Sequence, residues 1–174
     1  MATTPARNVQ ILLTNGSVNG LVVATEFNWT GRALSATFSH YDELRHREEL
    51  DGQGLFILSG PSLRTTRGSR TYVGAGAELR TALDEELGTV VHDVGWDRIT
   101  ALTSSDGFAS DQIPQYLKSR LLSTCADLAA TDMLQVPSPL PELSEPHRAI
   151  AENYLAEMLV MLGVLGITAF TPTQ

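Results

Sequence analysis

Two side chains in this sequence have acid–base chemistry at positions where it can be used, the phenol of Tyr72 and the ammonium of Lys118. A lysine that is desolvated beside a tyrosine has a pKa closer to neutrality, because burial disfavours its charged form. Such a pair can act as general acid and base on a small substrate. We therefore take Tyr72 and Lys118 as candidate catalytic residues, although nothing in the sequence names a substrate.

A binding cleft is expected around Tyr72, and the sequence offers four more side chains to line it. They are Phe56, Arg80, Trp96 and Arg120. Arg80 precedes Ala82 by two positions, so on a helix it points about 200° away from that residue. Trp96 is expected as a core aromatic or as a lid. The cleft would receive a protein partner or a small ligand.

The stretch that must position these residues spans 54–86, which predicts two strands followed by a helix. An apolar strand covers 55–58, a polar connector ends at Gly68, and a second strand ends at 72–73. The glycines of Gly74-Ala75-Gly76 are expected to let the chain turn sharply as it leaves the sheet. The helix after them carries the acidic run Asp84-Glu85-Glu86 at its end.

The rest of the chain supplies further elements of an α/β (α+β) fold. Strands are predicted at 9–13, 21–27, 32–38 and 99–103. One helix is predicted at 40–50, with Ser39 as its N-cap. A second is predicted to begin after Ser110 or Asp111, with Pro114 in its first turn. A third is predicted at 147–162, starting from Ser144. A loop is expected around His92 and Asp93. We divide the chain into an N-terminal β-meander plus helix (1–50), a central module (51–135) and a Pro-rich spacer with a C-terminal docking helix (136–174), all in one compact domain.

Several short motifs together resemble the GIY-YIG nuclease family, in particular its stand-alone bacterial proteins, over nearly the whole length. The motifs are Gly54-Leu55-Phe56, Tyr72-Val73-Gly74, Asn28-Trp29-Thr30-Gly31, Trp96-Asp97-Arg98 and Tyr116-Leu117-Lys118-Ser119-Arg120-Leu121. The resemblance implies a small antiparallel sheet flanked by helices, preceded here by the β-meander. It also implies a metal-dependent endonuclease ancestry.

The residues that carry the chemistry of that family are mostly replaced. Phe56 stands where the family has a tyrosine, Ala82 where it has an arginine and Glu86 where a histidine is common. Lys118 stands at the metal-binding glutamate, so an ammonium replaces the hard oxygen ligand that Mg²⁺ prefers. Only Tyr72 is retained. The pattern predicts a pseudoenzyme without Mg²⁺ or another cofactor, unless a carboxylate such as Asp111 replaces the missing ligand.

Composition points away from nucleic acid as a partner. The chain carries 12 Lys and Arg against 20 Asp and Glu, a formal net charge of −8. Affinity for nucleic acid depends largely on cationic side chains that neutralise phosphates. Arg64, Arg67 and Arg70 in the connector keep the possibility open.

Location and assembly follow from a few further features. The first ten residues lack the apolar run of a signal peptide, and the single Cys125 fits a reducing cytoplasm. The apolar stretch 155–170 is too interrupted to span a membrane. It is expected to dock on the module or to form a homodimer seam. No metal site is expected, because His40 and His46 do not share a helical face.

Three functions remain open from the sequence. The first is a non-catalytic protein that binds a partner or ligand in the former active-site cleft. The second is a divalent-metal-dependent endonuclease with a rearranged site. The third is a non-nuclease enzyme that uses Tyr72 and Lys118 on a small substrate.

Overall fold

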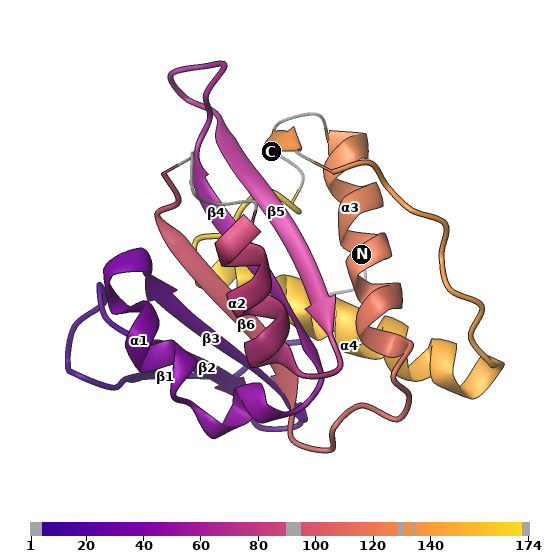
Figure 1. Ribbon diagram of the computed structural model, residues 1–174. Coiled ribbons are helices and arrows are strands. Elements are labelled where there is room, and N and C mark those ends of the chain that lie inside the picture. The colour runs from indigo at the N-terminus through magenta and orange to yellow at the C-terminus, as the bar shows by residue number, and fades with distance from the viewer. Residues whose placement is uncertain (1–4, 90–94, 129–130, 134, 172–174) are drawn as a thin grey trace.

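The computed structural model describes residues 5–89, 95–128, 131–133 and 135–171, and in this part of the chain seven strands form one sheet (Figure 1). The loop expected around His92 and Asp93 lies outside the described residues. The sheet order is β1-β2-β3-β6-β4-β5-β7. The strands are β1 (Val9–Leu13), β2 (Val22–Glu26), β3 (Gly31–Thr37), β4 (Gly54–Pro61), β5 (Ser69–Gly76), β6 (Arg98–Ser104) and β7 (Thr131–Met133).

The predicted α/β (α+β) class is confirmed. All strand pairs are antiparallel except that of β5 with β7, which is parallel. The helices are α1 (Tyr41–Arg45), α2 (Leu79–Thr89), α3 (Ile113–Leu128) and α4 (Glu145–Val164), with 3-10 turns η1 (Phe38–His40) and η2 (Glu48–Asp51). The predicted β-meander is present as β1, β2 and β3.

The strand β6 joins the two halves of the sheet. It pairs with β3 on one side, where Leu34 faces Ala101, and with β4 on the other, where Phe56 faces the same Ala101. The N-terminal meander and the β4–β5 hairpin therefore belong to one continuous sheet, and the boundary drawn at residue 50 is not a break in it.

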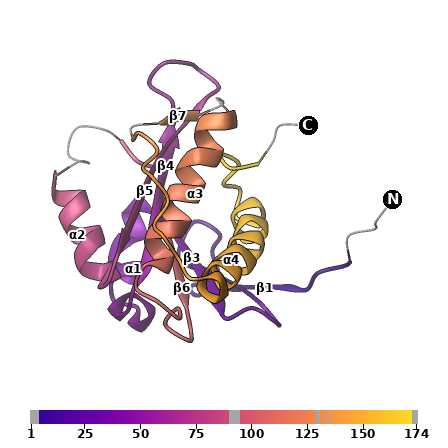
Figure 2. The same ribbon diagram turned by 90° about the vertical axis from the view of Figure 1, so that its right-hand side faces the viewer.

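Helices cover both faces of this sheet (Figure 2). One core, formed by α3 and α4 against Leu55, Ile57 and Val73, lies on one face. The other core, formed by α1, η2 and α2 against Phe56, Leu58 and other side chains, lies on the opposite face. Alternate residues of β4 thus enter opposite cores, which explains the uninterrupted apolar run Leu55-Phe56-Ile57-Leu58.

The glycines of β5 do not form the turn that the sequence predicts. The strand continues through Gly74 to Gly76, and Phe56 lies opposite Gly74 in the register. A Cβ at Gly74 would lie 2.2 Å from Cζ of Phe56. The residue is therefore glycine because the buried Phe56 ring occupies the space of a side chain, and not because the backbone bends there.

The predicted helix over 40–50 is also wrong, since it is broken into α1 and η2. Leu44 and Leu50 are both fully buried. Leu44 belongs to α1 and Leu50 to η2, so two separate turns bring these side chains into the same core. Extended backbone at Arg47 (ψ 135°) redirects the chain. Ser39 is in η1 and caps no helix with its side chain.

The C-terminal helix docks on the module, which is one of the two arrangements predicted for it. Its N-cap Ser144 accepts a hydrogen bond from the backbone N–H of His147, and the Tyr154 hydroxyl donates to the carbonyl of Thr103 at 2.7 Å. Its buried side chains are Ala151, Tyr154, Leu155, Met158, Met161 and Leu162. In the described part of the chain, no helix has the length and apolar character needed to span a membrane. Dimerisation stays a prediction.

Candidate functional site

Tyr72 lies in the core beneath α2 and is almost inaccessible. Its ring stacks on that of Phe56, with 6.3 Å between centroids, and the two side chains are 8% and 0% exposed. The Tyr72 hydroxyl donates to Oε2 of Glu86 at 2.8 Å. Burial, and then the carboxylate of Glu86, raise the pKa of Tyr72. The phenol is held as a neutral hydrogen-bond donor, which disfavours a role as a base.

Lys118 and Arg120 come from α3, on the other side of the sheet. Leu117 and Leu121 of the same helix pack in the core formed with α4, whereas Tyr72 belongs to the core beneath α2. Arg120 pairs with Glu152 of α4 at 2.9 Å. Lys118 is half-buried, and within the described residues it has no hydrogen bond or ion pair.

Arg80 and Asp111 do not reach Tyr72 either. Arg80 donates to the backbone carbonyls of Arg45 and Arg47, at 2.7 and 3.0 Å, and also pairs with Asp51. It thus fastens α2 to the α1–η2 segment. Asp111 is exposed and precedes the first residue of α3.

Trp96 is a core aromatic. Its ring packs against Arg70, a buried arginine that was predicted to lie in the polar connector. Trp96 is 5% exposed and Arg70 is 1% exposed. The guanidinium of Arg70 lies 4.3 Å from the Trp96 ring centroid and donates to the carbonyl of Gly95. Arg70 is therefore unavailable to a phosphate backbone, which leaves Arg64 and Arg67 as the exposed cations of the connector.

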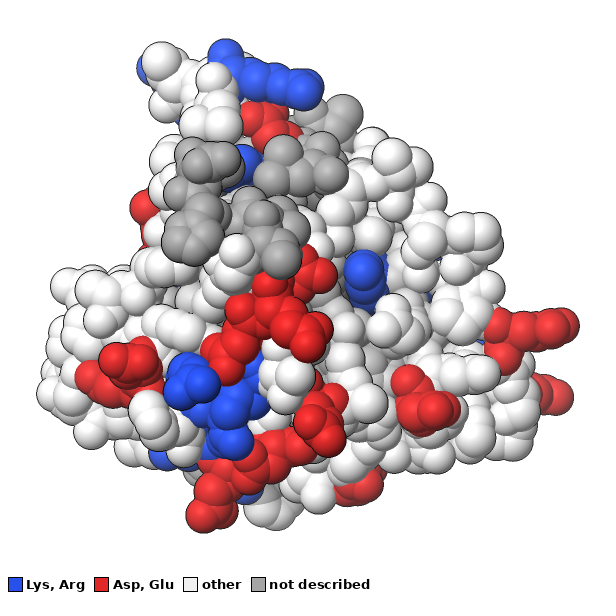
Figure 3. All heavy atoms as spheres, in the orientation of Figure 1, with Lys and Arg blue, Asp and Glu red and all other residues white. Residues whose placement is uncertain are grey.

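The acidic end of α2 contacts α1 as well as solvent. Asp84 accepts hydrogen bonds from Tyr41 at 2.5 Å and from Nε of Arg45 at 3.0 Å. Hydrogen bonding from Arg45 is the main reason that the pKa of Asp84 is lowered. Figure 3 shows acidic groups along α2 next to basic groups over α1. Asp84, the first residue of the acidic run, thus holds α1 in place.

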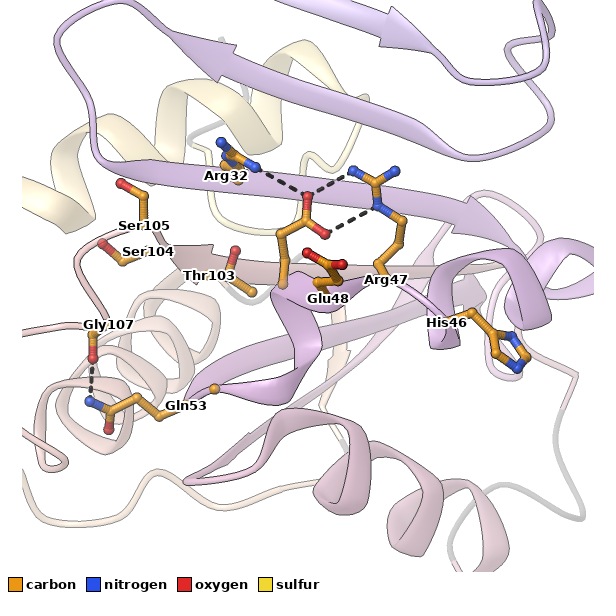
Figure 4. A pocket seen from close by; sticks show the side chains of 11 residues that line it. Arg32, His46, Arg47, Glu48, Gln53, Thr103, Ser104, Ser105 and Gly107 are labelled. Carbon is orange, nitrogen blue, oxygen red and sulfur yellow. Dashed lines mark hydrogen bonds and ion pairs between the residues drawn. The ribbon is translucent and has the colours of Figure 1, made fainter.

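An open groove of about 740 Å³ lies beyond α1, between η2 and the end of β6 (Figure 4). Its charged centre is Glu49, which accepts from Arg47 at 2.7 Å and from Arg32 at 3.2 Å. Burial opposes the charge of Glu49, but bonds from Arg47 and Arg32 outweigh it, and the pKa is lowered. Its lining residues are Arg32, His46, Arg47, Glu48, Glu49, Gly52, Gln53, Thr103, Ser104, Ser105 and Gly107.

Sequence reasoning missed this groove because its parts are far apart in the chain. Arg32 comes from β3, Arg47 from the break before η2, and Ser104 from the end of β6. Arg47 and Glu48 fall within the helix predicted over 40–50, which set neither residue apart. Neither Gly nor Pro marks the break at Arg47, where extended backbone separates α1 from η2, so no local signal pointed to the groove.

No group of three or more His, Cys, Asp or Glu side chains able to hold a metal ion occurs among the residues that the structure describes. Comparison of the chain with protein-family models, curated proteins and solved structures found no match. Its function must therefore be inferred from its own residues and their geometry.

Proposed function

We propose that this chain is a non-catalytic binding protein of GIY-YIG-like fold, whose nuclease chemistry has been lost. The observation that carries the proposal is the hydrogen bond from Tyr72 to Glu86, at 2.8 Å. A phenol that acts as a base must first lose its own proton, and one that positions a water must be accessible to that water. Here the hydroxyl is buried, its proton is committed to a carboxylate, and its pKa is raised.

The remaining candidate residues support the same proposal, because each is engaged in structure or lies elsewhere. Arg120 pairs with Glu152 across two helices, and Arg80 holds η2. Loss of both a metal ligand and a transition-state cation removes most of the rate enhancement of a phosphodiesterase.

We place the binding surface in the groove of Figure 4 rather than directly over Tyr72. Phe56 and Tyr72 present almost no surface to a ligand. The groove, in contrast, offers the guanidinium groups of Arg32 and Arg47 beside the carboxylates of Glu48 and Glu49. Such a balanced set of charges does not favour a polyanion such as nucleic acid.

The ligand that suits this groove is a polar segment of a partner protein. Hydroxyls of Thr103, Ser104 and Ser105 line one wall, and a peptide backbone presents the donors and acceptors that hydroxyls and charged groups can match. The open shape favours a protein over an enclosed small molecule. The single Cys125, which is buried, fits a cytoplasmic protein.

A nuclease assay tests the loss of activity. We expect purified protein not to cut supercoiled plasmid or single-stranded RNA with Mg²⁺ or Mn²⁺, and we expect neither ion to raise its melting temperature. Metal-dependent cutting that Tyr72→Phe abolishes would overturn the proposal and restore the endonuclease with a rearranged site. Turnover of a small substrate that depends on both Tyr72 and Lys118 would favour the third function instead.

Site-specific crosslinking tests the groove. A photoreactive residue at the exposed Ser105 should capture a defined partner in cells, whereas the same residue at the exposed Gln115 of α3 should not. Arg47→Gln should reduce the capture at Ser105, because it removes one of the two cations that orient Glu49. Equal capture at both positions, unaffected by Arg47→Gln, would contradict the assignment of the binding surface.

A further inference from the structure

A second pocket lies on the opposite face of the sheet, below the C-terminal end of α4. Its volume is about 300 Å³, which is the liquid volume of roughly ten waters and suits a molecule of about ten non-hydrogen atoms. Its floor is the end of β4 with the starts of β5 and β6, and its far wall is the turn that follows α4. The lining residues are Ser59, Gly60, Pro61, Ser69, Thr71, Asp97, Arg98, Leu165, Gly166, Ile167, Thr168 and Ala169.

Thr71 places an unsatisfied hydroxyl in the floor of this pocket. The residue is 2% exposed, and among the residues that the structure describes its Oγ1 has no hydrogen-bond partner. A buried hydroxyl without a partner is destabilising, and Val would fill the same volume without that cost. Oγ1 is therefore available to a ligand that enters the pocket.

Arg98 supplies a positive charge to the same floor. Ser59 lies opposite Arg98 in the β4–β6 register and opposite Thr71 in the β4–β5 register, so the three side chains form one row on one face. Arg98 is half-buried and donates to Oγ of Ser35 at 3.1 Å. Within the described residues it forms no ion pair, although a guanidinium has five N–H donors.

The walls of the pocket are fixed and partly apolar. The amide of Ile167 donates to the carbonyl of Leu162 at 2.8 Å, and that of Gly166 donates to Gly163 at 3.1 Å. These bonds close the turn, and Gly166 has the positive φ of 80° that the turn requires. Apolar side chains of Leu165 and Ile167 then face the row of polar residues.

We infer that this pocket binds a small organic monocarboxylate with a short apolar chain. Arg98 recognises the carboxylate, because guanidinium and carboxylate groups match in geometry and charge. The Thr71 hydroxyl donates a second hydrogen bond, and the apolar chain packs on Leu165 and Ile167. Asp97 at the pocket disfavours a second negative charge, so a dicarboxylate or a phosphate binds less well. This site is separate from the groove of the proposed function.

Titration with butyrate, with butyramide as its neutral counterpart, tests the inference in solution. Butyrate should shift the backbone amide resonances of Ile167 and Thr168 with a Kd of about 1 mM or tighter, as expected for so few atoms. Butyramide should bind at least about tenfold more weakly, because it lacks the charge that Arg98 recognises. Equal shifts from both compounds would show that Arg98 does not recognise the carboxylate, and no shift from either would show that the pocket binds neither compound. Either result would overturn the inference.

Two variants locate the binding. Arg98→Gln should weaken butyrate binding roughly 10- to 100-fold and Thr71→Val roughly fivefold, following the strengths of charged and neutral hydrogen bonds. Arg64→Gln, a change to an exposed arginine in the β4–β5 connector, should leave the affinity unchanged. Unchanged binding in folded Arg98→Gln would refute the assignment. If that variant does not fold, the comparison of butyrate with butyramide on the unmodified protein still decides the matter.

Discussion

The close approach of Phe56 to Gly74 gives a quantitative prediction. A Cβ at position 74 would lie 2.2 Å from Cζ and 2.4 Å from Cε1 of the Phe56 ring. Carbon atoms in van der Waals contact are separated by about 3.5 Å or more, so the ring must move by more than about 1 Å. Phe56 is fully buried and cannot do so freely. Gly74→Ala should therefore cost about 2–3 kcal/mol, the upper part of the range for overpacked cores.

Thermal unfolding and a double-mutant cycle measure this cost. For a chain of this size, about 2–3 kcal/mol lowers Tm by roughly 5–10 °C. In a Phe56→Leu background, which removes the clashing ring atoms, the cost of Gly74→Ala should fall by at least about 1 kcal/mol. Gly163→Ala, a change in α4 with no atom within 4 Å, serves as the control and should be neutral or slightly stabilising. A Gly74→Ala protein as stable as the original would refute the reasoning.

Three more predictions concern single interactions. Asp84→Asn should lower Tm at neutral pH but not near pH 2. Arg45 lowers the pKa of Asp84 in the folded state, so the ionised carboxylate stabilises the fold above its unfolded pKa and no longer does so once it is protonated. The same difference in Tm at both pH values would contradict this. Above about pH 10, Tyr72 ionises in the unfolded chain, whereas the native phenol keeps its proton because its pKa is raised. This difference lowers the stability of the original protein as the pH rises, so stability should fall less steeply with pH in Tyr72→Phe. Ser144→Ala should cost about 0.5–1 kcal/mol in urea unfolding by removing the cap of α4, whereas Ser144→Asp should restore most of it.

Much of the fold was accessible from the sequence, because strands and long helices carry their signals locally. The strand at Val9–Leu13 was predicted to the residue, and β6 was predicted within one residue at each end. Serine before proline marked the start of α4. In each case the alternation of apolar residues or the capping residue acts within one element.

The misses arise where a distant contact decides. Nothing near Gly74 reveals that the ring of Phe56 will occupy its side-chain space, so the glycine was interpreted as a turn. Arg70 was grouped with the connector cations Arg64 and Arg67, but it lies in β5, where the ring of Trp96 covers its guanidinium. The groove at Glu49 and the pocket at Thr71 each combine three strands or turns that meet only after the sheet has formed.

The position of β6 has a consequence for synthesis on the ribosome. Residues 31–37 and 54–61 are made early, but the strand that joins them, Arg98–Ser104, emerges only after the whole β4–β5 hairpin and α2. Until then the nascent chain carries two partial sheets, each with an unpaired edge that can associate with other chains. Nascent chains stopped before residue 98 should therefore require chaperones, and chains extended past residue 104 should depend on them far less.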